Sequence, residues 1–289
     1  MTLRGLIKRF QPLKLKVSGQ LPGCPWSVVL GALNPRLTGV HPPEMNIEMV
    51  AEEGAFKKMR FNGIHENWFP AATVINLELW NEYLAVFWEH PANAHNYLSH
   101  GTALKAGDVV VDCGCCEGFF VHQALAHKAS KIICIEPNPA LITCLEKTFA
   151  NEISTGTVVI KSAALGAFRG RAAFGFDAAY PAFGQLGEVA NSEMAKVETL
   201  AAVCEELGLT RVDFVKMDIE GAELQAIEGA MPVLKKHHPK LAVTTYHRSF
   251  DFVCLKAILG AAGYRTIKPV GITEFGQQGQ HRPVMLHAL

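Results

Sequence analysis

The chain has 289 residues, of which 49% are hydrophobic and 19% are charged, and its 27 basic side chains are balanced by 27 acidic ones. This composition excludes an intrinsically disordered chain and is sufficient for a sizeable buried core. The neutral balance argues against a broad nucleic-acid-binding surface, and no apolar run approaches the ~18 residues that a membrane span requires.

The first part of the chain, residues 1–100, predicts an N-terminal extension or cap. Its first residues include several basic side chains, which suggest either a solvated arm or a contact with a membrane surface or an acidic partner. These are Arg4, Lys8, Arg9, Lys14 and Lys16. We favour the arm, because one short basic stretch rarely anchors a protein stably. A helix is predicted from about Asn76 to His90, ending before Pro91. The apolar residues that recur there at helical spacing are Leu77, Trp80, Leu84 and Phe87.

Strand and helix patterns alternate over residues 101–289, which predicts an α/β domain with a parallel sheet and helices on both faces. The predicted strands are 109–113, 131–136, 157–160, 212–218, 241–246, 264–268 and 283–287. Residues 165–195 break the rhythm and are expected to form a hairpin or loop insertion. Such a segment either shapes a functional site or only packs over the domain. Its aromatic residues are Phe168, Phe174, Phe176, Tyr180 and Phe183.

The stretch Val109-Val-Val-Asp-Cys-Gly-Cys-Cys-Glu-Gly118 is typical of a strand that runs into a glycine turn and then a helix. Such a turn lets the backbone approach a ligand beyond the carboxyl ends of the strands. The order D-x-G-x-x-x-G matches neither the dinucleotide fingerprint nor a phosphate loop. Because Asp112 disfavours a bound diphosphate, the loop suits a ligand with a positive or hydrogen-bond-donating part. S-adenosylmethionine fits that description.

Acidic residues recur at the ends of the predicted strands or directly after them: Asp112, Glu136, Asp218 and Glu220. Because the carboxyl ends of parallel strands share one edge of the sheet, we expect these residues to converge there. Glu136 stands where such folds place an acid that accepts hydrogen bonds from both ribose hydroxyls. A single acid at a strand end is more often a turn former, so the repetition is what indicates a site.

Eight cysteines are scattered along the chain, and Cys113, Cys134 and Cys254 lie in apolar runs. This usage favours reduced structural thiols over a disulfide framework. Cys113, Cys115 and Cys116 lack partner ligands at the spacing of a zinc site, so no metal site is predicted. With no signal peptide recognisable at the N-terminus, we expect a cytoplasmic protein.

Several segments resemble known motifs. Val111–Gly118 resembles the first motif of class I S-adenosylmethionine-dependent methyltransferases, and Ile135-Glu-Pro-Asn138 resembles their second. Phe214-Val-Lys-Met-Asp-Ile-Glu-Gly-Ala-Glu223 and Val243-Thr-Thr-Tyr-His-Arg-Ser-Phe-Asp251 are together similar to the FkbM family of methyltransferases. This second pair is more selective than the first motif, and the resemblance extends over roughly residues 100–289.

The resemblance implies a Rossmann-like, seven-stranded, mostly parallel sheet with a reversed last hairpin, and residues 101–289 as the S-adenosylmethionine-binding domain. It assigns the cofactor to Asp112, Gly114, Cys115, Glu117, Gly118, Glu136, Pro137, Asn138, Ser162, Ala163, Asp218 and Glu220. Glu136 would hold the ribose, while Ser162 and Ala163 would border the adenine. The sequence departs from the family at Cys115 and Cys116, where the family more often has a small residue and an asparagine.

The reaction that the resemblance implies is methyl transfer, typically to a hydroxyl of a sugar, a polyketide or another small metabolite. Asp218, Glu220 and His247 would face the methyl group and the acceptor. His247 is the candidate base, because imidazole titrates near neutrality. Asp218 is the alternative, either as the base or as the group that orients His247. A core histidine bonded to the backbone, or a divalent cation held by the three residues, would also fit the pattern.

The expected partner is therefore a small hydroxylated acceptor, with no nucleic acid and no stable membrane insertion. Two competing functions fit the same motifs. One is a non-catalytic member of the fold that binds the cofactor or a partner. The other is a methyltransferase acting on a nitrogen or RNA acceptor, which the neutral charge disfavours. No motif indicates the oligomeric state.

Overall fold

The structure is a computed structural model that describes residues 3–21, 24–34, 40–181, 184–187, 192–275 and 280–289. Its centre is a seven-stranded sheet in the order β13-β14-β12-β11-β4-β5-β6. The strands are β4 (Val109–Cys113), β5 (Lys131–Glu136), β6 (Val158–Ser162), β11 (Phe214–Met217), β12 (Lys240–Thr244), β13 (Ile267–Phe275) and β14 (Gln280–Ala288). All neighbours pair in parallel except those of β14. The expected seven-stranded, mostly parallel sheet with a reversed last hairpin is therefore confirmed.

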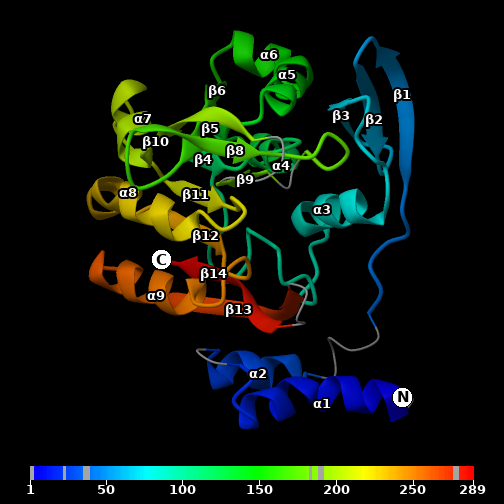
Figure 1. Cartoon of the computed structure of the whole chain (residues 1–289), viewed down its shortest axis with the longest axis vertical. Helices are drawn as coiled ribbons and strands as arrows, with labels where there is room; N and C mark the ends of the chain where they lie inside the picture. Colours follow the sequence, from blue (N-terminus) through cyan, green and yellow to red (C-terminus); the bar gives the residue numbers. More distant parts are fainter. Residues whose placement is uncertain (1–2, 22–23, 35–39, 182–183, 188–191, 276–279) are drawn as a thin grey trace.

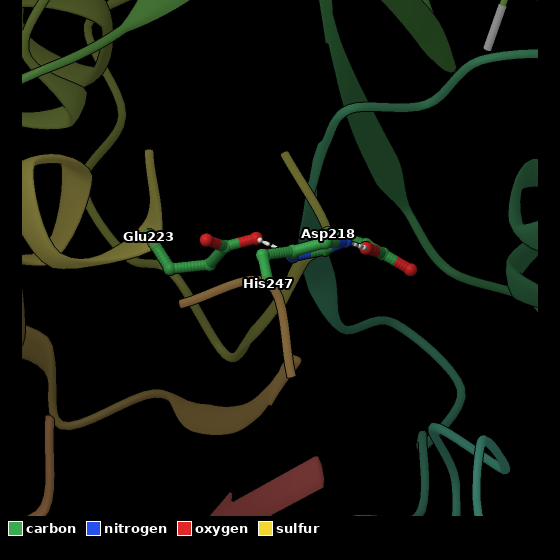
Figure 2. Close-up of side chains that lie close together, drawn as sticks. All are labelled: Asp218, Glu223 and His247. Carbon is green, nitrogen blue, oxygen red and sulfur yellow. Dashed lines mark hydrogen bonds and ion pairs between the residues drawn. The ribbon is translucent and has the colours of Figure 1, made fainter. Parts of the chain in front are cut away.

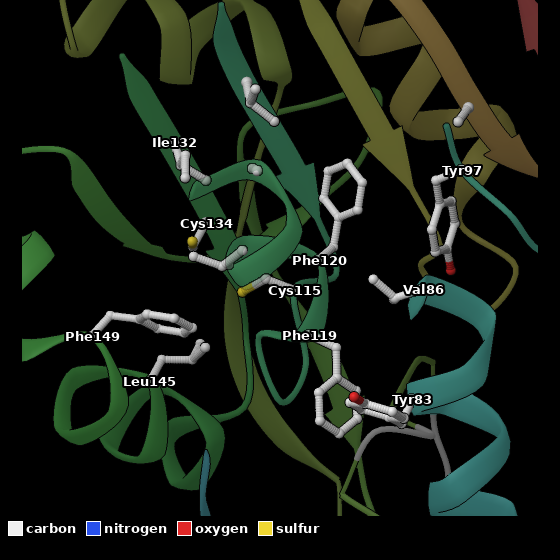
Figure 3. Close-up of a cluster of buried hydrophobic side chains, with 14 of the residues drawn as sticks. Tyr83, Val86, Tyr97, Cys115, Phe119, Phe120, Ile132, Cys134, Leu145 and Phe149 are labelled. Carbon is white, nitrogen blue, oxygen red and sulfur yellow. The ribbon is translucent and has the colours of Figure 1, made fainter. Parts of the chain in front are cut away.

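Both faces of this sheet are buried, which explains the long runs of β-branched residues in its strands. Val110, Ile132 and Phe214 belong to one hydrophobic cluster. The residues that follow them, Val111, Ile133 and Val215, belong to a second cluster on the opposite face of the sheet. Figure 3 shows part of the first cluster, where Phe119 and Phe120 project from α4 towards Tyr83 and Tyr97. The helices around the sheet are α4 (Phe119–Ala126), α5 (Pro139–Thr148), α6 (Ala150–Ser154), α7 (Leu200–Glu206), α8 (Glu223–His237) and α9 (Asp251–Ala261).

The first hundred residues are more structured than the sequence indicated. They form α1 (Leu3–Val17), α2 (Trp26–Ala32), α3 (Leu77–Phe87) and an antiparallel sheet of β1 (Ile47–Glu53), β2 (Phe56–Phe61) and β3 (His65–Pro70). In Figure 1, α1 and α2 lie below β13, while α3 lies between the small sheet and the central one. The predicted helix exists, and the Asn76 side chain caps it by accepting hydrogen bonds from the backbone N–H groups of Glu78 and Leu79. It ends at Phe87, three residues before His90.

The insertion at 165–195 contains the expected hairpin. β8 (Gly170–Gly175) pairs with β10 (Glu193–Glu198), and β7 (Ala164–Leu165) and β9 (Gln185–Leu186) complete a four-stranded sheet in the order β7-β10-β8-β9. Phe183 lies outside the described residues. All eight cysteines are free thiols, as expected. Within the described ranges, no helix combines the length and apolar character needed to cross a bilayer.

Candidate functional site

Two adjoining clefts open where the parallel strands end. The first cleft, of about 470 Å³, lies between the ends of β5 and β6 and the insertion. The second cleft, of about 530 Å³, lies between the glycine turn, α3 and the end of β11. The residues that line both clefts are Gly114, Cys116, Asp218 and Glu220. The two clefts therefore meet at the glycine turn and the end of β11.

The glycine turn needs glycine at positions 114 and 118, because neither position has room for a side chain. Gly114 has φ +73°, and a Cβ there would lie 2.1 Å from the carbonyl oxygen of Asp218. Gly118 has φ +84°, and a Cβ there would lie 2.5 Å from the Phe149 ring. Both values of φ are disfavoured for side-chain-bearing residues. The first glycine thus lets the turn contact the end of β11, and the second lets α4 begin against α5.

Glu136 is held at the end of β5 by two backbone donors. Its Oε2 accepts a hydrogen bond from the Cys116 N–H at 3.1 Å, and its Oε1 accepts one from the Asn138 N–H at 2.9 Å. Burial raises the pKa of this carboxyl to about 7, although the two N–H groups oppose the shift. Cys116 itself has φ +47°, a conformation that asparagine tolerates better than cysteine.

Asp112 lies beneath the glycine turn rather than in either cleft. Its side chain is fully buried and its Oδ1 lies 3.1 Å from Lys216 Nζ. Lys216 also donates a 2.6 Å hydrogen bond to the Gly114 carbonyl. Burial raises the pKa of Asp112, and the Lys216 charge opposes that shift. This ion pair therefore ties β11 to β4 and fixes the floor of the turn.

His247 lies among three carboxylates, and Figure 2 shows it between Glu223 and Asp218. Its Nδ1 is 2.8 Å from Glu223 Oε1, and its Nε2 is 3.4 Å from Glu220 Oε2 and 3.7 Å from Asp218 Oδ1. Burial alone would lower the pKa of His247, but hydrogen bonds to Glu220 and Glu223 raise it to about 11. The imidazole is therefore protonated near neutral pH in this environment.

Asp218 is oriented by two hydroxyl groups. Tyr97 donates to Oδ2 at 2.8 Å, and Thr244 donates to Oδ1 at 3.1 Å. Burial would raise the pKa of Asp218, but the charges of His247 and Lys216 outweigh it and lower the pKa. Asp218 is therefore an ionised carboxylate with a fixed orientation at the junction of the two clefts.

One group of side chains within the described ranges has the geometry to hold a cation. Asp218, Glu223 and His247 each place one ligand atom within 4.8 Å of the others. The set differs from the one expected from sequence, since Glu223 takes the place of Glu220. Glu223 Oε1 already accepts a hydrogen bond from the Ile219 N–H at 3.0 Å, and the Thr244 hydroxyl that donates to Asp218 lies 3.2 Å from it. The arrangement is thus an ion-pair network in which His247 supplies the positive charge.

The sequence-predicted residues divide into those that line the clefts and those that support them. The lining residues are Gly114, Cys115, Glu117, Glu136, Pro137, Ala163, Asp218 and Glu220. The supporting residues are Asp112, Gly118, Asn138, Ser162 and His247, none of which lines either cleft. Asn138 caps α5 by accepting from the Ala140 N–H, and Ser162 pairs with Glu136 across β5 and β6.

Several residues that line the clefts were not predicted from the sequence. Glu82 of α3, together with Tyr97, lines the second cleft. The sequence pattern could have indicated Glu82. Glu78 and Glu82 are four residues apart on a largely apolar helix, so they share one face of it. Tyr97 stands in no motif. The insertion contributes Phe174, Pro181, Gly184 and Leu186 to the first cleft, so it shapes the site and does not only pack.

The sequence matches one family model, described as the methyltransferase FkbM domain, over residues 112–266. These bounds contain the glycine turn, Glu136, Asp218 and His247. No curated protein gives a significant match.

Comparison with solved structures supports the fold. The methyltransferase FkbM from Methylobacillus flagellatus KT aligns at 20% identity with a TM-score of 0.51, covering 74% of this chain and 50% of that one. The chain thus spans about half the length of that relative. A weaker likeness is to fibrillarin of Aeropyrum pernix with natively bound S-adenosyl-L-methionine, at 13% identity and TM-score 0.42, covering 85% of this chain and 99% of that one. Another is to precorrin-6y C5,15-methyltransferase of Geobacter metallireducens, at 12% identity and TM-score 0.40, covering 76% and 93%.

Proposed function

The chain belongs to the FkbM family of methyltransferases, and from that premise we propose that it transfers the methyl group of S-adenosylmethionine to a hydroxyl of a sugar, a polyketide or another small metabolite. The observation that carries the proposal is the pair of clefts that meet at Gly114, Cys116, Asp218 and Glu220. A cofactor with a nucleoside part and a methionine part needs two adjoining compartments, and its methyl group would lie near their boundary, where the acceptor must be aligned.

The first cleft suits the nucleoside part of the cofactor. Glu136 presents a carboxylate fixed by two backbone donors, which is the geometry for accepting hydrogen bonds from ribose hydroxyls. Ala163, Leu165 and Phe174 supply apolar walls for the adenine. The second cleft would receive the methionine part, because its acidic lining complements an ammonium and a sulfonium group. Glu117 fits this role, since its carboxyl is buried and lines the second cleft.

When bound, S-adenosylmethionine would supply a methyl group already activated by the positive sulfur. The chain's own task is to align the acceptor hydroxyl and to take its proton. We assign the proton to Asp218, which is ionised, oriented by Tyr97 and exposed to both clefts. Its pKa is low, but a hydroxyl becomes strongly acidic as its oxygen takes up the methyl group. A weak base is therefore sufficient if it is in place.

His247 is assigned a positioning role. The carboxylates around it keep the ring protonated, so it has no free site to accept a proton near neutral pH. Its charge holds Asp218 and Glu220 in place at the boundary of the clefts. This geometry favours the alternative in which Asp218 is the base over the one in which His247 is.

Calorimetry with S-adenosylmethionine and S-adenosylhomocysteine tests the cofactor. We expect both to bind in the micromolar range, within the roughly 1 μM to 1 mM that is usual for substrates. The acceptor is then sought by incubating the protein with methyl-labelled cofactor and a small-molecule cell extract. Absence of binding with both compounds would remove the cofactor assignment. Binding of both without any labelled product would point to a non-catalytic member of the family.

A further inference from the structure

A third cleft, of about 290 Å³, adjoins the second cleft. It lies between the start of α3 and the loop 179–181 of the insertion, and we refer to it as the side cleft. A backbone hydrogen bond of 3.0 Å from the Val74 N–H to the Ala179 carbonyl joins its two walls. The side cleft shares Glu82 and Glu117 with the second cleft and Pro181 with the first. A molecule bound there could therefore reach into the second cleft, which Asp218 also lines.

One buried polar group among the described residues lines the side cleft without a partner. Thr73 is 4% exposed and its Oγ1 makes no hydrogen bond. Glu117 also lines the cleft and is 5% exposed, and the hydrogen bond to its carboxyl comes from its own backbone N–H. Buried polar groups are normally hydrogen-bonded, so an exception at a cleft wall points to a partner from outside the chain.

The charge of the side cleft is acidic. Glu78, Glu82 and Glu117 line it, and no basic side chain does so among the described residues. Burial, with the nearby charges of Asp218 and Glu117, raises the pKa of Glu82 to about 8. Burial likewise raises the pKa of Glu117 to about 7. A positive group between the two carboxyls would relieve this repulsion, whereas an anionic ligand would increase it.

We propose that the side cleft is an acceptor subsite for a protonated amine, held by Glu82 with Thr73 as a further hydrogen-bond partner, while Glu117 between the two clefts remains assigned to the cofactor. The acceptor would then be a hydroxylated molecule that also carries an amino group, such as an amino sugar or an amino alcohol. This inference rests on the proposed function, because it specifies the substrate class of the same site. A volume near the lower end of ligand pockets suits one sugar-sized unit.

The test uses two probes that differ in a single group, methyl 2-amino-2-deoxyglucopyranoside and methyl glucopyranoside. Each is titrated by calorimetry into the full chain saturated with S-adenosylhomocysteine, at a pH where the amine is protonated. We expect the amino sugar to bind about tenfold more tightly or better, since a hydrogen bond to a charged group is worth roughly 1.5–3 kcal/mol. Equal binding of the two probes, or no binding of either, would overturn the proposal.

Variants assign the preference to the side cleft. Glu82→Gln should remove most of the amine preference, and Thr73→Val should weaken both probes. Glu89→Gln is the matched control, because Glu89 is exposed just beyond the same helix and should keep the preference. If Glu82→Gln retains the amine preference, the subsite assignment fails.

Affinity for S-adenosylhomocysteine and thermal melting are measured first in each variant. Loss of cofactor binding in the parent chain would remove the proposed function, whereas intact cofactor binding without an amine preference would remove this inference alone.

Discussion

The side-chain amide of Asn67 donates a 2.7 Å hydrogen bond to the backbone carbonyl of Glu117, which ties β3 to the glycine turn. Asn67 is fully buried, and its Oδ1 lies 3.1 Å from His122 Nε2 on α4. The N-terminal sheet therefore does more than cover the central domain. It fixes the turn at the residue whose carboxyl lines the second cleft and the side cleft.

Replacing Asn67 by alanine should loosen the turn. The change leaves the buried Glu117 carbonyl without its donor, which costs about 1–3 kcal/mol of unfolding free energy. We expect a lower melting temperature and weaker binding of S-adenosylhomocysteine by calorimetry. Tyr264→Phe is the matched control, because it also removes one donor to a backbone carbonyl, that of Pro239, on the other face of the sheet. Equal losses of affinity in both variants would contradict the coupling.

The central sheet could be predicted closely from the sequence, because its strands are short β-branched runs between turn residues. The strand predicted at 131–136 has the bounds of β5. The convergence of Glu136, Asp218 and Glu220 on one cleft could also be predicted, because the carboxyl ends of parallel strands share one edge of the sheet. The small N-terminal sheet could not. All side chains of β1 are exposed or half-buried, so its sequence lacks the alternation that marks a strand.

Two residues that line the second cleft, Glu82 and Tyr97, were missed by the sequence prediction for the same physical reason. Glu82 and Tyr97 reach the second cleft from the N-terminal extension, whose placement depends on tertiary packing. Tyr83 of α3 lies edge-on against Phe119 of α4, with ring centroids 5.5 Å apart. This packing turns the face of α3 that carries Glu82 towards the cleft. No local pattern in the sequence encodes such a contact between distant segments.

The pH dependence of stability should reflect three carboxyls of the clefts, of which Glu82 is half-buried and Glu117 and Glu136 are buried. The folded-state pKa is raised to about 8 for Glu82 and about 7 for Glu117 and Glu136, mainly by burial. A raised pKa gives stability that is present below the unfolded value of 4.5 and is lost as the pH rises through the folded value. The raised pKa of His247 acts in the same direction above 6.5. We therefore expect the melting temperature of the ligand-free protein to fall between pH 6.5 and about 8.

Glu82→Gln should make that fall smaller, because it removes the carboxyl with the highest pKa of the three. Glu205→Gln, at an exposed position on α7, should leave the fall unchanged. The buried histidines whose pKa is lowered to about 4 or about 3 act below pH 6.5 and do not mask the effect. A melting temperature that rises over this interval would show that the carboxyls are paired in solution.

The roles of Asp218 and His247 can be separated once a labelled product is found. Asp218→Asn should reduce the rate of methyl transfer by about 10²-fold or more, which is the usual contribution of a general base. His247→Gln should reduce it less, because the ring only positions Asp218 and Glu220. Tyr97→Phe, which removes one hydroxyl from the same network, is the control for a loss of orientation alone. A larger loss in His247→Gln than in Asp218→Asn would reverse the two assignments.

The close approach at Gly114 gives the sharpest test of the glycine turn. Gly114 and Gly156 have nearly equal φ values of +73° and +75°, so alanine is strained similarly at both. Only at Gly114 would the added Cβ meet backbone, at 2.1 Å from the Asp218 carbonyl, whereas nothing lies within 4 Å at Gly156. Gly156→Ala should therefore cost about 1 kcal/mol of unfolding free energy and leave cofactor affinity intact. Gly114→Ala should cost more and abolish binding of S-adenosylhomocysteine, because the turn and the end of β11 must separate. Equal effects of the two substitutions in melting and calorimetry would show that the contact between the turn and β11 is not what shapes the clefts.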